Sequence, residues 1–239
     1  MTTDARASET RHPGADYLEA LYELEEESFP MVQAEIARWM GVSRPSVSEH
    51  VKRLVGDGLL AADGRTLSFT RAGREMAIGL VRRHRLAEHL LIDVIGLPWH
   101  QAHQEAEVWE RVISAQVEER LVDILGDPGA CPHGNPIPGS SHEVDVTSLT
   151  ALNEVAPGTS VTLRRLTEDL ELELAVMRFL EESGLMPGAE IVVDGLGPDG
   201  SMRLSVAGQS VALGTDLADN LWVESMADGA TTPSSFAPE

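Results

Sequence analysis

The chain has 239 residues, which is enough for two or three small domains, and 42% of them are apolar, which is enough for well-packed cores. No apolar run approaches the roughly 20 residues of a membrane span, and the N-terminus lacks the pattern of a signal peptide. Cys131 is the single cysteine, which excludes a disulfide framework within the chain. We therefore expect a cytoplasmic protein.

The net charge of −21 argues against a non-specific nucleic-acid binder, but the charge is unevenly distributed. Residues 31–85 contain ten Lys or Arg and five Asp or Glu, a local net charge of +5. A basic patch on an acidic body can face phosphates while the rest of the surface repels them. Elsewhere the acidic excess is typical of a solvated surface.

The first part of the chain predicts a winged helix-turn-helix. Apolar spacing predicts helices over 16–27, 32–40 and 43–56, the last of them capped by Ser43 with Pro45 in its first turn. Two short strands, 59–62 and 67–70, surround Asp63-Gly64, a hairpin turn signal. Three helices followed by a hairpin form the winged pattern.

The middle of the chain predicts two further helices. They cover 72–95 and about 99–125, and the second carries an apolar stripe that is typical of a core or a dimer interface. Residues 126–157 are rich in Gly, Pro, Ser and His, which predicts a linker or a loosely packed loop.

The last part of the chain predicts a small β-barrel with one helix. Short alternating segments between 159 and 224 predict its strands, and 172–183 its helix. The expected domains are a DNA-binding domain (1–73), a helical metal-binding and dimerisation domain (74–140), a linker (141–157), an SH3-like barrel (158–225) and a disordered tail (226–239).

Metal-type ligands recur at helical spacing in the two middle helices. His84 and Glu88 are four residues apart, and His103, Glu107 and Glu110 follow at spacings of four and three. In a helix each set shares one face. If the two faces meet, imidazole and carboxylate groups form the combination that hard to borderline divalent metals bind.

The helix that starts at Arg44 is the candidate DNA-reading element, because a recognition helix points its N-terminal residues at base edges in the major groove. Hydroxyl groups there can bond to bases or phosphates, Arg44 to guanine or phosphate, and Glu49 can accept from cytosine. A winged helix used only for protein contacts is the alternative, and the local positive charge favours DNA. The predicted DNA-binding residues are Ser43, Arg44, Pro45, Ser46, Ser48, Glu49, Lys52 and Arg65.

Several motifs together resemble the diphtheria toxin repressor family of metal-dependent transcriptional repressors. They are DYLEALYELEEE, GVSRPSVSEHVKRLVGDGLL, RRHRLAEHLL, GLPWHQAHQEAEVWE, HGNPIPG and PGAEIVV, and they span about residues 16–224. The resemblance implies a mainly α fold with a small β part, in which a winged helix, a helical dimerisation domain and an SH3-like barrel follow one another. It also implies a homodimer that binds palindromic double-stranded operator DNA when divalent metal is bound.

The resemblance further implies two metal positions, up to two ions per chain. The ancillary position corresponds to His84, Glu88, His103, Glu168 and Glu171. The primary position corresponds to Asp16, Glu107, Glu110 and residue 111, with Glu19 nearby. Iron-sensing members typically have Met and Cys where Asp16 and Glu107 stand, whereas manganese-sensing members have carboxylates, and carboxylates favour hard Mn(II). We therefore expect Mn(II) as corepressor, with Fe(II) as the alternative.

Arg111 departs from the family pattern, which has a histidine ligand at this position. A guanidinium stays protonated and cannot act as a ligand. Either the carboxylates hold the metal alone, or Arg111 swings out, or the primary site is weakened. A metal-independent DNA-binding regulator with this site closed by Arg111 is therefore a second hypothesis.

A metalloenzyme is a third hypothesis, since His and carboxylate ligands can support hydrolysis. No separate general base or nucleophile is evident, so no enzymatic activity is expected. The remaining histidines (His12, His89, His100, His133 and His142) have no matched partners in the sequence and are interpreted as structural or solvent-facing. Cys131 neighbours His133 but lacks further ligand spacing, so no zinc or nucleophile role is expected for it.

Overall fold

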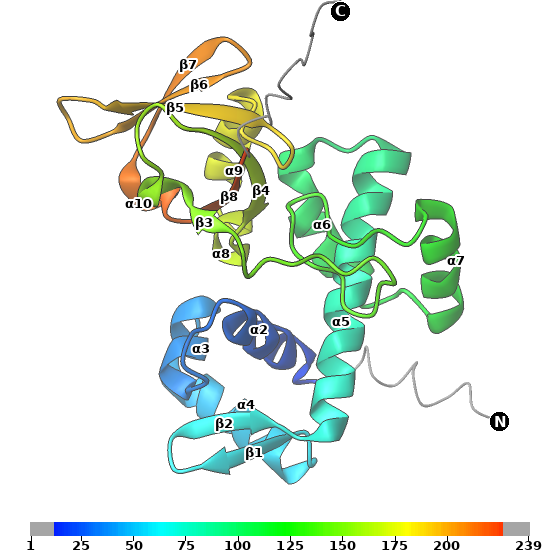
Figure 1. The fold of residues 1–239 in the computed structure, drawn as a ribbon. Helices are drawn as coiled ribbons and strands as arrows, with labels where there is room; N and C mark the ends of the chain where they lie inside the picture. The colour runs from blue at the N-terminus through cyan, green and yellow to red at the C-terminus, as the bar shows by residue number, and fades with distance from the viewer. Residues whose placement is uncertain (1–11, 227–239) are drawn as a thin grey trace, which may run out of the picture. The chain divides into compact units, whose positions relative to one another are not determined.

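The computed structural model describes residues 12–226, and the tail expected from residue 226 falls almost entirely outside this range. The described residues form two compact units. The first contains the chain up to residue 146 together with 167–179, and the second contains 147–166 together with the chain from 180 onward. Helices dominate the first unit and strands the second (Figure 1).

The predicted winged helix-turn-helix is confirmed. Its elements are α2 (Ala15–Glu26), α3 (Gln33–Trp39), α4 (Arg44–Gly56) and the antiparallel hairpin of β1 (Leu60–Asp63) and β2 (Thr66–Phe69). Ser43 caps α4 by accepting a hydrogen bond from the backbone N–H of Ser46 at 3.4 Å. Gly41 has a φ of 63°, the left-handed conformation that the tight turn between α3 and α4 requires.

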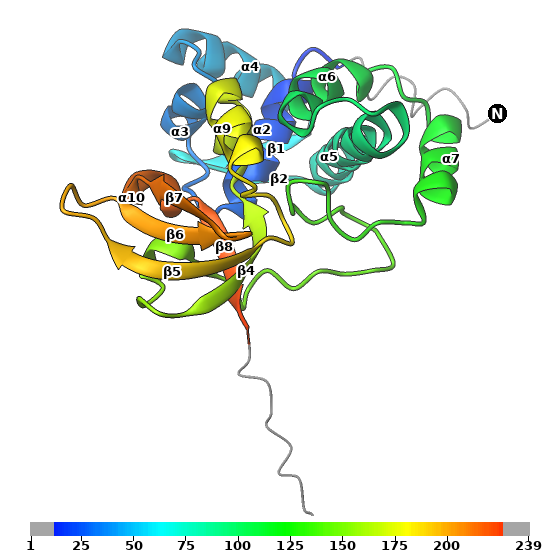
Figure 2. The same cartoon turned by 90° about the horizontal axis from the view of Figure 1, so that it is seen from above.

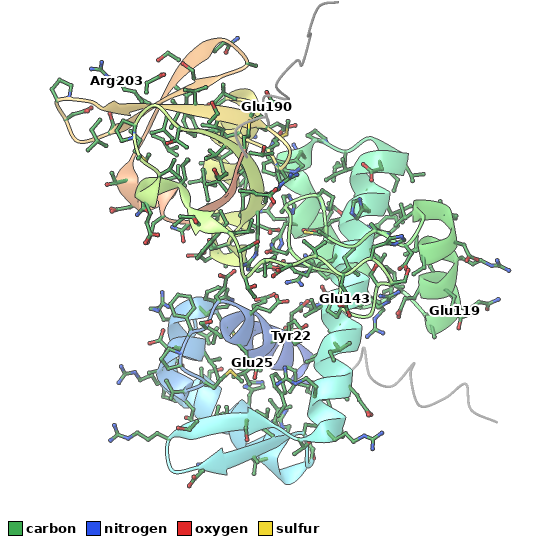
Figure 3. All side chains as sticks on the ribbon, in the orientation of Figure 1. Tyr22, Glu25, Glu119, Glu143, Glu190 and Arg203 are labelled. Atoms are coloured by element: carbon green, nitrogen blue, oxygen red, sulfur yellow. The ribbon has the colours of Figure 1, made fainter. Side chains whose placement is uncertain are left out.

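The core of the winged helix joins its helices to the first turns of α5 (Arg71–His89). Leu18, Leu21 and Leu24 of α2 are fully buried and belong to one apolar cluster with Ala77 and Leu80 of α5. At the surface, Nη2 of Arg74 donates to Glu25 at 2.8 Å, and the guanidinium lies 6.0 Å from the ring centre of Tyr22. Figure 3 labels Tyr22 and Glu25 on α2. Helix α5 is thus fixed to α2 by apolar burial, with an ion pair at its edge.

Helix α5 continues into the metal-binding part, where one sequence prediction is wrong. It passes into a π-helical turn (Leu90–Ile95), followed by a 3₁₀ turn (Trp99–Gln101), α6 (Ala102–Trp109) and α7 (Ala115–Leu125). The single helix expected over 99–125 is broken because Ser114 caps a new helix, accepting from the N–H of Val117 at 3.3 Å. Val117 and Ile124, two apolar residues of this stretch, are exposed in the single chain.

The prediction of a loosely packed loop over 126–157 is also wrong in part. Cys131, His133, Asn135 and Ile137 are buried, and Ile137 belongs to the apolar cluster formed with α5, α6 and α7. The N–H of Cys131 donates to the carbonyl of Asn135 at 2.8 Å. The segment is therefore an ordered loop that carries polar side chains into the interior.

The second unit contains a six-stranded antiparallel sheet in the order β3-β8-β4-β5-β6-β7, and Figure 2 shows the β5 to β7 hairpins. The predicted SH3-like β-domain is confirmed. Its elements are β3 (Thr150–Ala151), a 3₁₀ turn (Leu152–Glu154), β4 (Ser160–Leu166), β5 (Glu190–Leu196), β6 (Met202–Val206), β7 (Gln209–Leu213), α10 (Thr215–Ala218) and β8 (Leu221–Ser225).

The helix predicted over 172–183 is confirmed, and a short helix that was not predicted precedes it. They are α9 (Leu174–Glu182) and α8 (Glu168–Glu171), respectively. Residues 167–179 belong to the first compact unit, so α8 and the beginning of α9 pack there rather than with the strands. None of the helices within residues 12–226 is both long and apolar enough to cross a membrane.

Candidate metal centre

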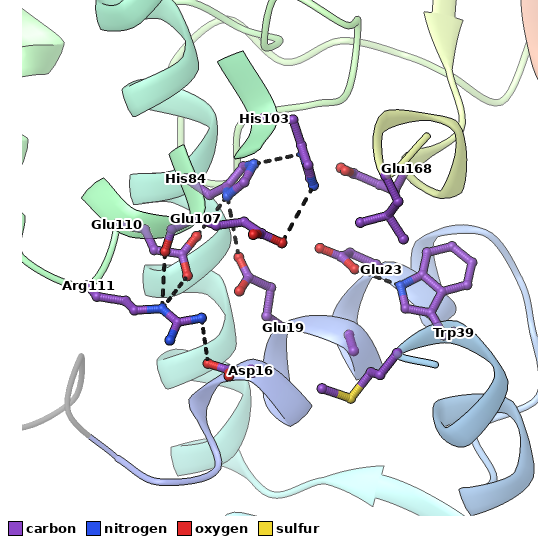
Figure 4. A pocket seen from close by; sticks show the side chains of 13 residues that line it. Asp16, Glu19, Glu23, Trp39, His84, His103, Glu107, Glu110, Arg111 and Glu168 are labelled. Atoms are coloured by element: carbon purple, nitrogen blue, oxygen red, sulfur yellow. Dashed lines mark hydrogen bonds and ion pairs between the residues drawn. The ribbon is translucent and has the colours of Figure 1, made fainter. Parts of the chain in front are cut away.

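Helices α2, α5 and α6 bring predicted ligands from three parts of the chain together (Figure 4). The ring of His84, on α5, has its Nδ1 atom 2.7 Å from Glu110 Oε2 and 3.9 Å from Glu19 Oε1. Its Nε2 atom lies 3.1 Å from His103 Nδ1 and 3.3 Å from Glu88 Oε1. His84 therefore connects the ancillary and primary positions that the sequence analysis had separated.

Helix α8 supplies two more carboxylates to the same interior. Glu171 Oε2 lies 3.1 Å from His103 Nδ1, and its other oxygen accepts a hydrogen bond from Asn135 Nδ2 at 2.7 Å. Glu168 is buried as well, and Arg85 Nη2 approaches its Oε1 atom to 2.5 Å. The structure thus brings together all five residues predicted for the ancillary position: His84, Glu88, His103, Glu168 and Glu171.

His133 and Cys131 are candidate ligands outside the predicted set, and the interpretation of His133 as a residue without matched partners is wrong. The His133 ring is fully buried, with Nδ1 2.8 Å from Glu171 Oε2 and 3.0 Å from Glu88 Oε1. Cys131 Sγ, Glu88 and His133 offer ligand atoms within 4.8 Å of one another. These residues lie on an irregular loop, so the sequence contains no helical spacing that would predict them as ligands.

The buried atoms of this cluster fit a divalent cation. Both carboxylate oxygens of Glu88, Oε2 of Glu171 and both ring nitrogens of His133 are buried without a hydrogen bond of acceptable geometry, although they approach one another closely. Such atoms are costly to bury unless something else satisfies them. Imidazole, carboxylate and thiol groups that converge on one interior are the donor set of a borderline metal ion.

The electrostatics of the cluster show charged, mutually paired groups. Burial alone lowers the pKa of His84, but its hydrogen bond with Glu110 and its close contact with Glu88 outweigh burial and raise the pKa well above its ordinary value. For His103, burial is outweighed by contacts with Glu171 and Glu88, which raise the pKa to about 10. Burial disfavours ionisation of Glu88, but the charge of His133 lowers its pKa well below the usual range.

Only some of the residues predicted for the primary position converge in the structure. Glu19, His84 and Glu110 offer ligand atoms within 4.8 Å of one another, and burial, followed by the charge of Glu110, raises the pKa of Glu19. Asp16 and Glu107 are half-exposed, and the Glu107 carboxylate lies 4.0 Å from His103 Nε2. These residues line a pocket of about 220 Å³. The groups of Glu19, His84 and Glu110 fit a cation, whereas Arg111 lies beside the exposed carboxylates.

Arg111 lies among the exposed carboxylates of the primary position. Its Nη2 atom is 3.2 Å from Asp16 Oδ1, and its Nε atom donates to the backbone carbonyl of Glu107 at 3.0 Å (Figure 4). The same Nε atom is 3.8 Å from Glu110 Oε1. Asp16 therefore faces a guanidinium.

The predicted DNA-reading residues lie along α4, most of them at its start, and on the β1–β2 turn. All are exposed except Ser46 and Ser48, which are partly buried. The hydroxyl groups of Ser46 and Tyr17 are 3.1 Å apart, and the Tyr17 ring stacks on His50 at 4.3 Å. Helix α2, which carries Asp16 and Glu19, is thus in direct contact with the first turn of the recognition helix.

The fold and the centre define a winged-helix DNA-binding protein with buried ligands for divalent metal. Three family profiles match the chain in succession: "Iron dependent repressor, N-terminal DNA binding domain" over residues 14–66, "Iron dependent repressor, metal binding and dimerisation domain" over 70–139 and "FeoA domain" over 150–225. The chain belongs to the diphtheria toxin repressor family of metal-dependent, DNA-binding transcriptional repressors, which are not enzymes.

Individual relatives cover nearly the whole chain. The iron-dependent repressor IdeR of Mycobacterium tuberculosis is 40% identical over 219 residues, 87% of this chain and 95% of that protein. The diphtheria toxin repressor of Corynebacterium diphtheriae is 37% identical over 223 residues, 88% of this chain and 96% of that protein. A solved manganese-dependent transcriptional repressor in complex with manganese superimposes with a TM-score of 0.77 at 29% identity, covering 89% of this chain and all of that one.

Proposed function

We propose that this chain represses transcription in response to Fe(II), which binds the groups around His84: Glu88, His103, Glu171 and His133 on one side, and Glu19 and Glu110 on the other. One observation carries the proposal: the buried atoms Glu88 Oε1 and Glu171 Oε2 both lie within 3.0 Å of His133 Nδ1, and none of these three atoms makes a hydrogen bond of acceptable geometry. A bound divalent ion supplies the positive charge that satisfies them.

The donor set supports Fe(II) over the Mn(II) expected from the sequence. That expectation depended on carboxylates at Asp16 and Glu107, but Asp16 pairs with Arg111 and Glu107 is half-exposed. The structure adds an imidazole, His133, and a thiol, Cys131, to the interior. Nitrogen and sulfur donors favour Fe(II) over Mn(II). The relatives of 37–40% identity quoted above carry the names iron-dependent repressor and diphtheria toxin repressor.

Helix α2 supports coupling between the ion and DNA. Glu19 extends from this helix to His84 and Glu110, while Tyr17, two residues earlier, contacts Ser46 at the start of the recognition helix. An ion held by Glu19, His84 and Glu110 would restrain α2 against α5 and α6. The recognition helices of a homodimer would then be held at the spacing of a palindromic operator.

DNA binding itself is proposed to use the residues predicted from the sequence. Arg44 and Glu49 are exposed in the first turns of α4, where base edges are within reach, while Lys52 and Arg65 suit phosphate contacts. A regulator of this kind acts in the cytoplasm, where its operator lies.

Mn(II) is the second candidate, and two observations favour it. The group of Glu19, His84 and Glu110 contains two carboxylates, which suit a hard ion. The manganese-dependent repressor described above shares the fold over the full length of its chain.

An anaerobic operator-binding titration with each metal tests the proposal. We expect Fe(II) to increase operator affinity at lower free-ion concentration than Mn(II), and a chelator to abolish the increase. Glu88→Gln should lose the response, whereas Glu105→Gln, at an exposed position of α6, should keep it. A stronger response to Mn(II) would select the second candidate. Equal operator affinity with and without every metal would contradict both candidates.

A further inference from the structure

The exposed part of the primary position does not fit a metal ion, because a side chain of the protein already supplies the positive charge there. We propose that the Arg111 guanidinium replaces one of the two ions that the family resemblance implies. The chain then binds its metal only in the buried groups around His84 and Glu88. This inference rests on the proposed function in so far as the buried groups bind divalent ions.

The geometry around Arg111 is that of a cation site occupied by a guanidinium. Three oxygens surround it: the Asp16 carboxylate at 3.2 Å from Nη2, the Glu107 carbonyl at 3.0 Å from Nε and Glu110 Oε1 at 3.8 Å from Nε. A guanidinium has only donors and stays protonated, so it offers no lone pair to a metal. A divalent ion between Asp16 and Glu110 would also meet its positive charge at close range.

Glu110 lies between the buried metal ligands and the Arg111 guanidinium. Its Oε2 atom pairs with His84 Nδ1 at 2.7 Å, facing the buried ligands, while its Oε1 atom faces Arg111. Glu19 lies on the His84 side. The group of Glu19, His84 and Glu110 can therefore accept an ion while Asp16 remains paired with Arg111.

The Asp16–Arg111 pair affects how metal binding can control the position of α2. This pair connects α2 to the turn that follows α6 without using a metal ion, but both side chains are 50% exposed. An ion pair so exposed is weak and is screened by salt. Glu19 is therefore the residue of α2 through which a bound ion would connect this helix to the metal-binding helices.

Ion counting on the full chain tests the inference without DNA. Equilibrium dialysis against Mn(II), followed by elemental analysis, gives ions per chain for the wild type, Asp16→Asn, Arg111→His and the double variant. We expect Asp16→Asn to leave the wild-type count unchanged. Arg111→His should add one ion per chain, visible also in the electron paramagnetic resonance of bound Mn(II), and the double variant should lose that added ion.

Two control variants distinguish the effect of adding an imidazole ligand from the effect of removing the charge of Arg111. Arg111→Gln removes the charge without adding an imidazole and should not add an ion. Arg120→His places an imidazole at an exposed position of α7 and should change nothing. Loss of one ion in Asp16→Asn alone, or an unchanged count in Arg111→His, would overturn the inference. Failure of the proposed function is distinguishable, because it would appear as metal-independent operator binding whatever the ion counts.

Discussion

The Nδ1 atom of His133 lies 2.8 Å from Oε2 of Glu171, joining the loop that follows α7 to helix α8. Both side chains are buried, and Glu88 from α5 lies within 3.0 Å of the same ring nitrogen. Three separate segments therefore meet at one imidazole. This relationship makes His133 a candidate ligand that lies outside the helical ligand pattern.

Replacing His133 tests its role in metal binding. We expect His133→Ala to weaken metal binding at least as much as the loss of an outer-shell partner does, roughly 10–100-fold. His142→Ala is the matched control, because His142 is exposed and contacts Asp127 and Ser141 of its own loop. Isothermal titration calorimetry measures both. Wild-type affinity in His133→Ala would show that the imidazole is a structural group only.

The buried thiol of Cys131 should be unreactive in the folded protein. Burial raises its pKa to about 12, so the nucleophilic thiolate is scarce near neutral pH. We expect iodoacetamide to modify Cys131 much more slowly in the native protein than in denaturant, measured by mass spectrometry over time. Equal rates in the two conditions would mean that the loop opens readily.

Metal binding should release protons. Contacts with carboxylates raise the pKa of His103 to about 10 and that of His84 well above its ordinary value, so both carry protons near neutral pH in the metal-free protein. An ion must displace those protons, and therefore affinity should rise with pH between about pH 6 and pH 8. Calorimetry in buffers of different ionisation enthalpy counts the protons. An affinity that is flat over this range would show that the histidines are already neutral.

Lys52 should contribute to operator affinity through phosphate alone. It is exposed on α4, and each phosphate contact contributes about −0.9 to the slope of log affinity against log salt. We expect Lys52→Ala to reduce the magnitude of that slope by about one and to weaken cognate and non-cognate DNA equally. Arg120→Ala, on the exposed surface of α7, is the control. A loss confined to the cognate sequence would assign Lys52 to base recognition.

Gly73 should be intolerant of a side chain. A Cβ atom there would lie 1.9 Å from the backbone oxygen of Leu59, so the start of α5 would have to move away from the wing. We expect Gly73→Ala to reduce the free energy of unfolding by about 1–3 kcal/mol or more. Gly56→Ala meets nothing within 4 Å and should be neutral to about 1 kcal/mol stabilising. Urea denaturation of the two variants compares them, and equal stabilities would contradict the close approach.

Local chemistry allowed much of the fold to be predicted. The cap at Ser43 and the leucine spacing of α2 act within a few residues, so the winged helix could be recognised from the sequence alone. The helix break at Ser114 was missed, because an apolar stripe continues through it and periodicity alone does not register a cap.

The sequence by itself also determined the ligand types. His84 and Glu88, and His103 and Glu107, share helix faces through local periodicity, and Arg111 could be recognised as an unsuitable ligand by its chemistry. Only the tertiary structure decided which of these groups converge. The approach of His133 and Glu171 depends on an irregular loop and a short helix packing against α5, and such long-range contacts leave no period in the sequence. The same packing decided that Asp16 faces Arg111, because that ion pair joins the beginning of α2 to the turn that follows α6.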